Sequence, residues 1–162
     1  MGERGANTPQ GRALRDFEII YKLYDEGMRD LGKSFRSRAR EVPSFLYEVG
    51  LISGLSFIYA KTDDANKGIY RIFLNYLERK TEDLKKSEDL KELNSREGGY
   101  AAYLYLLLLE ASRLVPDREL NPKDPLSCIK TLEELDRPLI PLLMPYLLEI
   151  KRLAEATLPS EG

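Results

Sequence analysis

The sequence contains no histidine, no tryptophan and a single cysteine, Cys128. Histidine is the commonest general base and metal ligand in proteins, so its absence excludes Ser–His and Cys–His nucleophile pairs and histidine-based metal centres. One cysteine excludes an intramolecular disulfide and fits a reducing compartment. We therefore expect a protein that is not an enzyme and that has no cofactor and no metal site.

The chain also lacks a large excess of charge of either sign. Its 25 lysines and arginines stand against 27 aspartates and glutamates, which gives a net charge of −2. A domain that binds nucleic acid by itself usually carries a large basic excess. The composition therefore argues against strong nucleic-acid binding by the isolated chain and leaves room only for a local basic face.

The N-terminal segment lacks an apolar core. Its residues, MGERGANTPQGR, are polar and do not resemble a signal peptide, so we expect a cytoplasmic protein. Residues 1–11 show no apolar period and predict a disordered arm. Residues 12–158 then form one domain of ordinary size, with enough apolar residues (43% of the chain) for a core.

Apolar residues recur at steps of three and four along most of the chain, and no segment shows sustained period-two alternation. This pattern predicts an all-α, single-domain bundle of about six helices. The segment from Gly98 to Val115 is apolar nearly all round and is expected at the centre. The other main helices are expected at Arg12–Met28, Pro43–Lys61 (with Pro43 as its first residue), from Asp63 or Asp64 to Lys80, Asp124–Thr131, and from Pro138 or Pro141 to Leu158, with a short exposed helix within residues 78–97.

The stretch FRSRAREVPSFLYEVGLISGLSFIYAK, from Phe35 to Lys61, joins a basic lead-in to an apolar run. Residues 42–60 carry one charge, Glu48, and at about 1.5 Å per residue would nearly span a bilayer core. Glu48, a proline, three serines and two glycines nevertheless make insertion costly, because one central acidic side chain costs about 2.5 kcal/mol or more. The run is better explained as a core helix, and no membrane partner is expected.

The basic lead-in contains Lys33, Arg36, Arg38 and Arg40. On a helix, residues 36 and 40 share a face and residue 38 lies nearly opposite. The cations either form a solvated helix end that pairs with Glu41 or contact nucleic-acid phosphates. As exposed charges, the three arginines are expected to be replaceable by Glu without loss of the fold. The later pair Lys151-Arg152 carries the same ambiguity.

The stretch from Phe35 to Lys61 resembles the signature region of the small α-helical subunit of the type III-B (Cmr) CRISPR effector complex. The similar features are the aromatic and basic lead-in, Pro43 before a helix, the Gly50-Leu51 step and an apolar helix that ends in Lys61. YAAYLYLLLLEASRL is similar to the central helix of that family and LLEIKRLAEATL to its closing helix. The resemblance covers residues 31–158 as a pattern.

The resemblance implies a non-catalytic scaffold in antiviral defence. Copies of such a subunit stack along a filament with the other Cmr subunits and help form the groove for CRISPR RNA and target RNA. The alternatives are the small subunit of an archaeal type I complex, a helical protein–protein adaptor, or an enzyme that uses carboxylates only, for which no carboxylate pair is visible. The nucleic-acid contacts expected from the resemblance are Lys33, Arg36, Arg38, Arg40, Lys61, Lys151 and Arg152.

Overall fold

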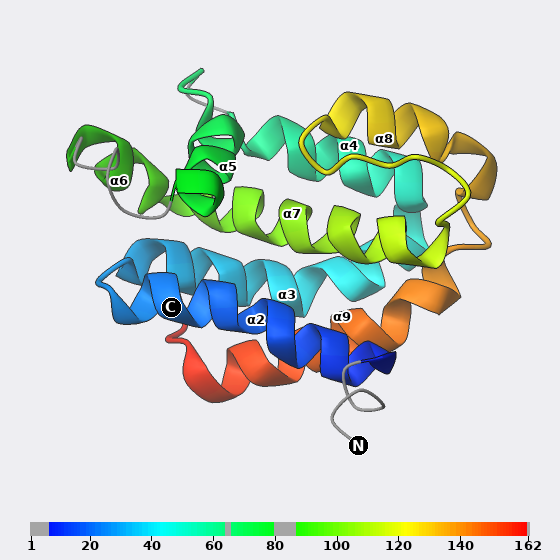
Figure 1. Cartoon of the computed structure of the whole chain (residues 1–162). Coiled ribbons are helices and arrows are strands. Elements are labelled where there is room, and N and C mark those ends of the chain that lie inside the picture. The colour runs from blue at the N-terminus through cyan, green and yellow to red at the C-terminus, as the bar shows by residue number, and fades with distance from the viewer. Residues whose placement is uncertain (1–6, 64–65, 80–86, 162) are drawn as a thin grey trace.

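Helices follow one another along the chain in the computed structural model, which describes residues 7–63, 66–79 and 87–161. Eight α-helices, one 3-10 helix and no strand occur within these ranges, so the predicted all-α class is confirmed (Figure 1). The helices are α2 (Pro9–Asp25), α3 (Arg29–Val49), α4 (Leu51–Lys61), α5 (Ile69–Arg79), α6 (Ser87–Leu93), α7 (Arg96–Leu114), α8 (Pro125–Thr131), the 3-10 helix η2 (Glu133–Leu135) and α9 (Ile140–Thr157).

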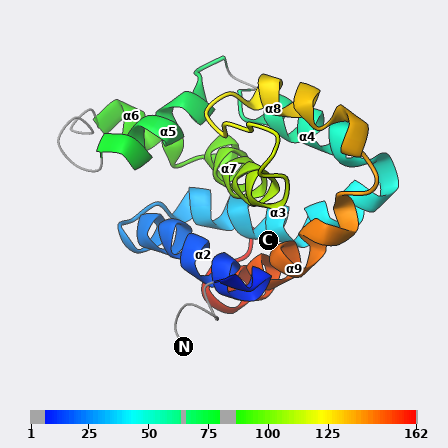
Figure 2. The ribbon, with the colours of Figure 1, turned by 45° about the vertical axis from the view of Figure 1, so that its right-hand side comes forward.

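Helix α7 lies at the centre of the bundle, as its all-round apolar sequence predicts. Viewed nearly along its axis, α7 has α3 beneath it and α4, α5 and α8 above it (Figure 2). Nearly every side chain between residues 98 and 111 is buried. Burial of one leucine side chain contributes about 1.5–3 kcal/mol, so α7 supplies a large share of the apolar stabilisation.

Two glycines allow α3 and α7 to approach each other closely. A Cβ atom on Gly99 would lie 2.3 Å from Ser34 Oγ, and one on Gly98 would lie 1.8 Å from the carbonyl oxygen of Leu93. The Ser34 hydroxyl adds a hydrogen bond between α3 and α7, because it donates to the Arg96 carbonyl at 2.7 Å. A larger residue at position 99 would push α3 away from α7, and one at position 98 would collide with the backbone at the end of α6.

Helix α2 begins at Pro9, three residues before the predicted start. The Thr8 side chain accepts a hydrogen bond from the Gly11 amide at 2.9 Å, and Pro9 occupies the first turn, where its missing N–H is harmless. Residues 1–6 of the predicted arm lie outside the described residues. Asp124 and Pro125 start α8 by the same combination of cap and proline, as predicted.

The break between α3 and α4 falls at Gly50, not at Pro43. The prediction that Pro43 begins a helix is wrong, because α3 runs through it to Val49. Gly50 has φ = 91°, which a glycine adopts easily. A distant segment stabilises the break: Asp136 Oδ1 accepts from the Ile52 amide at 2.7 Å, and Arg137 Nη1 donates to the Tyr47 carbonyl at 2.9 Å.

The segment between α4 and α7 is described in part. Asp63 Oδ1 accepts from the Gly68 amide at 2.6 Å just before α5 begins, which is close to its predicted role as a cap. Asp64 and residues 80–86 lie outside the described residues. The exposed helix that was predicted within residues 78–97 corresponds to α6.

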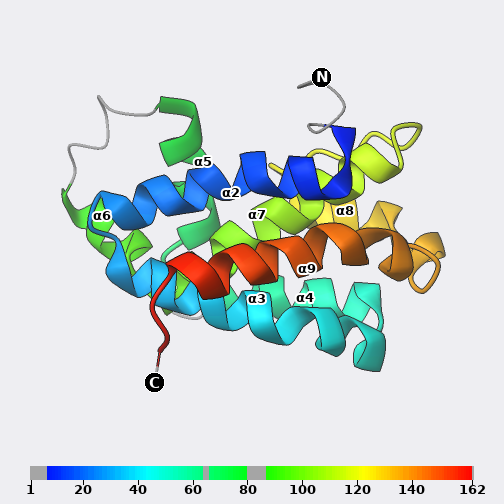
Figure 3. The same ribbon diagram turned by 90° about the horizontal axis from the view of Figure 1, so that it is seen from below.

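Helices α2, α9 and α3 form one layer of the bundle, with α9 between the other two in the view from below (Figure 3). Helix α9 begins at Ile140, close to the predicted start at Pro138 or Pro141, and continues through Pro145. In the described part of the chain, no helix has the length and apolar character that crossing a membrane requires.

Candidate nucleic-acid interface

Four of the seven predicted contacts lie on α3, and the helical period separates them into two groups. Lys33, Arg36 and Arg40 recur at steps of three and four and so share one side of the helix. Lys33 and Arg36 are half-buried and Arg40 is exposed. Arg38 lies on the other side, where its side chain is only 2% exposed. The expectation that Arg38 is an exposed charge is therefore wrong.

Arg38 is packed between α3 and the first turns of α7. Its guanidinium carbon lies 4.2 Å from the centre of the Tyr100 ring, a cation–π contact. Its hydrogen bonds are long: 3.3 Å from Nη1 to Ser34 Oγ and 3.4 Å from Nη2 to Glu41 Oε1. Its Nε atom is buried and has no hydrogen-bond partner among the described residues. Stacking holds this guanidinium more than hydrogen bonding does.

The side of α3 that carries Lys33, Arg36 and Arg40 lies beside α9. Arg40 Nε lies 3.1 Å from Glu155 Oε2, which links the two helices. Lys151 precedes Glu155 by one helical turn, so it lies on the same side of α9, toward α3. We call Arg36, Arg40 and Lys151 the seam cations, because they follow the seam between α3 and α9.

Arg152 and Lys61 lie apart from the seam cations. Arg152 is 65% exposed, and its Nη1 donates to Glu149 Oε1 at 2.7 Å on the next face of α9. Lys61 ends α4, with its Nζ 5.5 Å from the centre of the Phe57 ring. Since α4 packs on α7 and α3 across the bundle from α9 (Figure 2), the structure does not gather all seven predicted residues on one surface.

The segment after α9 contributes a residue that sequence reasoning missed. The Ser37 hydroxyl donates to Glu161 Oε1 at 2.6 Å, and Arg38 Nη2 lies 3.7 Å from the same oxygen. Figure 3 shows this segment leaving α9 beside the first turns of α3. No periodic pattern marks a residue beyond the end of a helix, so nothing in the sequence pointed to Glu161. We call Ser34, Ser37, Arg38, Glu41 and Glu161 the Arg38 cluster.

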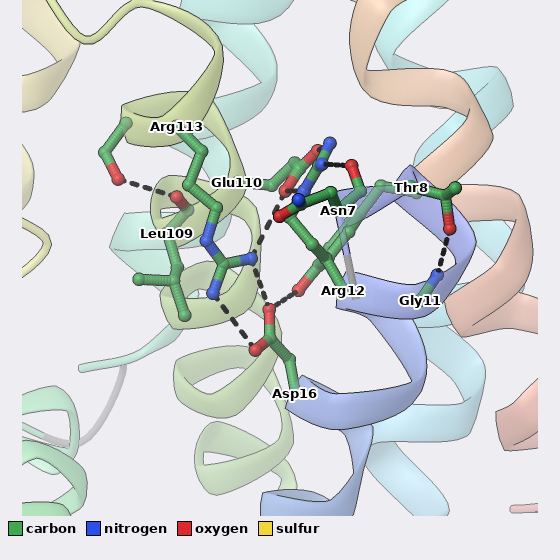
Figure 4. A network of polar contacts seen from close by, with 10 residues as sticks. Asn7, Thr8, Gly11, Arg12, Asp16, Leu109, Glu110 and Arg113 are labelled. Atoms are coloured by element: carbon green, nitrogen blue, oxygen red, sulfur yellow. Dashed lines mark hydrogen bonds and ion pairs between the residues drawn. The ribbon is translucent and has the colours of Figure 1, made fainter. Parts of the chain in front are cut away.

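A second charged network, also missed, ties α2 to α7 and α9. Arg12 donates to both carboxylate oxygens of Glu110, at 2.9 and 2.7 Å, and Arg113 donates to both oxygens of Asp16, at 2.7 and 3.1 Å (Figure 4). Arg113 also lies 3.3 Å from Glu110, and the Tyr146 hydroxyl donates to Asp16 at 2.7 Å. Glu110 is fully buried and Asp16 is 4% exposed. We call these five residues the polar clamp.

The electrostatics of the polar clamp are balanced internally. Burial by itself lowers the pKa of Arg113, but its hydrogen bonds with Asp16 and Glu110 and the charge of Asp16 outweigh burial, so the pKa is raised. Burial, followed by the charge and the hydrogen bond of Asp16, raises the pKa of Tyr146 well above its ordinary value. Two arginines therefore match two carboxylates, and both carboxylates are fully engaged as acceptors.

Asp16 and Glu110 form the carboxylate pair that the sequence did not reveal. Both oxygens of each carboxylate accept hydrogen bonds from a guanidinium. Neither carboxylate is therefore placed to exchange a proton with a substrate as a general acid or base does. Groups of three or more His, Cys, Asp or Glu side chains arranged to hold a metal ion do not occur among the described residues. The pair stabilises the bundle.

Comparison with known proteins places the chain in a family. A family model described as CRISPR-associated protein (Cas_Cmr5) matches residues 8–106, which include all of α3. The protein CRISPR system CMR subunit Cmr5 of Saccharolobus solfataricus is 32% identical over 150 residues, covering 89% of each chain. No solved structure gives a significant match. The resemblance to the Cmr small subunit is thereby confirmed, and the chain belongs to the Cmr5 family of CRISPR-associated proteins.

Proposed function

We propose that the chain is a non-catalytic small subunit of a type III-B Cmr ribonucleoprotein complex in antiviral defence. The match to a Cmr subunit along 89% of both chains carries this proposal, because it extends over most of the chain and not over one motif. Copies of the subunit stack along the filament beside the other Cmr subunits. Their surfaces help form the groove that holds CRISPR RNA and target RNA.

The surface that faces RNA in this proposal is the seam between α3 and α9. Lys33 and the seam cations give it a row of basic side chains on a rigid helix pair. An arginine presents a planar fork of donors that matches two phosphate oxygens. Arg152 flanks the row, and the buried Arg38 lies on the other side of α3.

Repetition along the filament explains how a chain of net charge −2 takes part in RNA binding. A few cations on one copy attract RNA weakly, and salt screens the attraction. Stacked copies join their rows into one groove, and linked weak contacts raise the overall affinity without a new type of contact. The isolated chain is therefore expected to bind RNA poorly compared with the assembled complex.

Photo-crosslinking in the assembled complex tests the proposal. The chain is co-expressed with the other Cmr proteins of its source, purified through a tag on one of them, and bound to a target RNA that contains 4-thiouridine. We expect co-purification of the chain and crosslinked peptides from α3 and α9. Failure to co-purify would contradict the assignment as a subunit, and crosslinks confined to α2, α5 or α8 would contradict the proposed RNA surface.

A further inference from the structure

The carboxylate of Glu161 sits among hydrogen-bond donors and positive charges on α3. Ser37 donates to its Oε1 at 2.6 Å, and Arg38 Nη2 lies 3.7 Å from that oxygen. The carboxylate shares a hollow of about 410 Å³ with Lys33 and Arg96, whose other walls are Asp30, Asn94 and Ser95. An acidic side chain from the segment after α9 thus borders a hollow together with two cations, Lys33 and Arg96, and one other carboxylate, Asp30.

The guanidinium of Arg38, which lies 3.7 Å from the same carboxylate, is only partly hydrogen-bonded. Arg38 is only 2% exposed, yet its contacts to Ser34, Glu41 and Glu161 span 3.3–3.7 Å. Guanidinium–carboxylate hydrogen bonds of good geometry are about 2.7–2.9 Å long. The Nε atom has no hydrogen-bond partner among the described residues, and the Tyr100 ring blocks one face. A buried arginine in this state retains donor capacity for an anion.

We propose that the Arg38 cluster is a binding site for a phosphate of the RNA backbone and that Glu161 is its intramolecular occupant. This inference rests on the proposed function, because it names what regulates the same surface. In the free chain the carboxylate holds the site. When RNA reaches α3, a phosphate takes over the contacts to Ser37 and Arg38, and the segment after α9 is released.

Charge considerations favour phosphate over the acidic side chain of another protein. A phosphodiester carries one negative charge, as Glu161 does, so the exchange preserves the local charge balance. The cations do not stop at this site: Arg36, Arg40 and Lys151 continue the row along the seam. A repeating anionic chain can contact every member of such a row, and RNA is a repeating anionic chain. The Glu155–Arg40 pair shows that α9 supplies a second carboxylate to the same row.

The test compares Glu161→Gln with Glu133→Gln in the full chain. Glu133 is an exposed carboxylate on η2, at the opposite end of the bundle from the end of the chain (Figure 1), so its replacement changes the net charge equally. Binding of a fluorescent oligouridylate is measured by anisotropy over a salt series. We expect E161Q to bind at least about threefold more tightly than the parent chain, the scale of one partly exposed ion pair. E133Q should change the affinity by less than about 1.5-fold.

The salt series adds a count of contacts. One additional phosphate contact steepens the slope of log K against log salt concentration by about 0.7 for single strands, and we expect this change for E161Q alone. Adding Ser37→Ala to E161Q should return the affinity toward that of the parent chain, because it removes a donor of the site. Unfolding by urea, followed by circular dichroism, verifies that every variant is folded.

Equal affinities of E161Q and the parent chain, or no detectable binding by either, would overturn the inference. A gain of affinity for a hexaglutamate peptide instead of RNA would overturn it in favour of an acidic protein partner. Its failure is distinguishable from failure of the proposed function. Crosslinks from α3 in the complex together with an unchanged E161Q would remove only this inference, whereas a tighter E161Q without such crosslinks would remove the proposed RNA surface of the complex.

Discussion

The polar clamp and the Arg38 cluster are built from the same residue types but differ in how well their donors are satisfied. In the clamp, Arg12 and Arg113 each make two short hydrogen bonds to one carboxylate, between 2.7 and 3.1 Å. In the cluster, Arg38 makes contacts of 3.3–3.7 Å, and its Nε has no partner among the described residues. Both arginines of the clamp and Arg38 lie at helix–helix contacts.

This difference separates a structural role from a binding role. Burying a charge is unfavourable unless it is paired and hydrogen-bonded, so a saturated network fixes the packing of the helices it joins. The clamp ties α2, α7 and α9, and both of its carboxylates accept bidentate guanidinium contacts. The Arg38 cluster is completed by a residue from outside the helices, Glu161. We infer that the polar clamp stabilises the bundle and that the Arg38 cluster binds a ligand.

The largest effect is expected from breaking the clamp at its most buried carboxylate. Glu110→Gln keeps the shape of the side chain but leaves Arg12 without a matching charge, whereas Arg113 keeps Asp16. Removing one partner of a buried pair costs about 3–5 kcal/mol of unfolding free energy. Urea unfolding of E110Q beside the exposed control E133Q measures this loss. A difference below 1 kcal/mol between the two variants would show that the clamp is not what holds the bundle.

Two buried tyrosines sharpen the comparison at the level of one hydroxyl. Tyr146 donates to Asp16, whereas the Tyr103 hydroxyl is buried with no hydrogen-bond partner in the described part of the chain. Tyr146→Phe removes one of the two donors to Asp16 Oδ2, the other being Arg113, and is expected to cost about 1–3 kcal/mol. Tyr103→Phe removes an unsatisfied group and should be neutral or stabilising. Thermal and urea unfolding of both variants provide the check. Equal losses would contradict the assignment of Tyr146 to the clamp.

The same pair predicts a response to alkaline pH. Burial raises the pKa of Tyr146 above the ordinary value of 10, so this phenol contributes stability that is complete below pH 10. The contribution is lost as the pH rises above 10, because the unfolded chain releases the proton first. Each such phenol steepens the decline by up to about 1.4 kcal/mol per pH unit. Urea unfolding between pH 9 and 11 should show a shallower decline for Y146F than for the parent chain, and identical slopes would contradict this account.

A smaller effect is expected at the Arg38 cluster. Arg38→Met keeps an extended apolar stem but removes long, imperfect hydrogen bonds and the cation–π contact. Glu41, the acceptor left behind, is 63% exposed and stays solvated. We expect a change in unfolding free energy within about 1–2 kcal/mol, the scale of a partly buried cation–π contact. A loss as large as that of E110Q would mean that Arg38 is as structural as the clamp.

Periodic apolar residues made most of the fold predictable. The central place of α7 follows from its all-round apolar sequence, and α8 follows from Asp124 before Pro125, because both signals are local. The break at Gly50 was not predictable in the same way. Pro43 is a strong local signal for a helix start, but Asp136 and Arg137, which are far away in the sequence, stabilise the ends of α3 and α4. Tertiary contacts overrode local preference there.

The candidate site was predictable only as a set of cations. Spacing places Arg36 and Arg40 on one side of a helix and Arg38 on the other, yet spacing cannot tell which side faces the core. Burial of Arg38 depends on Tyr100, more than sixty positions later, and on Glu161 after the last helix. The polar clamp escaped prediction because its partners are separated by 97, 98 and 130 positions and no local pattern couples them.

Neutralising the seam tests most directly whether its cations serve RNA and not the fold. The assembled complex is prepared with Arg36→Gln and Arg40→Gln together, beside a control with Lys123→Gln and Lys130→Gln on the α8 side, which removes the same charge. Equilibrium capture of target RNA is measured over a salt series, with urea unfolding of each free chain. We predict unfolding free energies within about 1 kcal/mol of the parent chain. Capture by the seam variant should be weaker at low salt, with a shallower salt dependence because fewer counterions are released, while the control captures RNA as the parent does. Capture equal to that of the parent at every salt concentration would contradict the account and leave the seam cations as a solvated edge of α3.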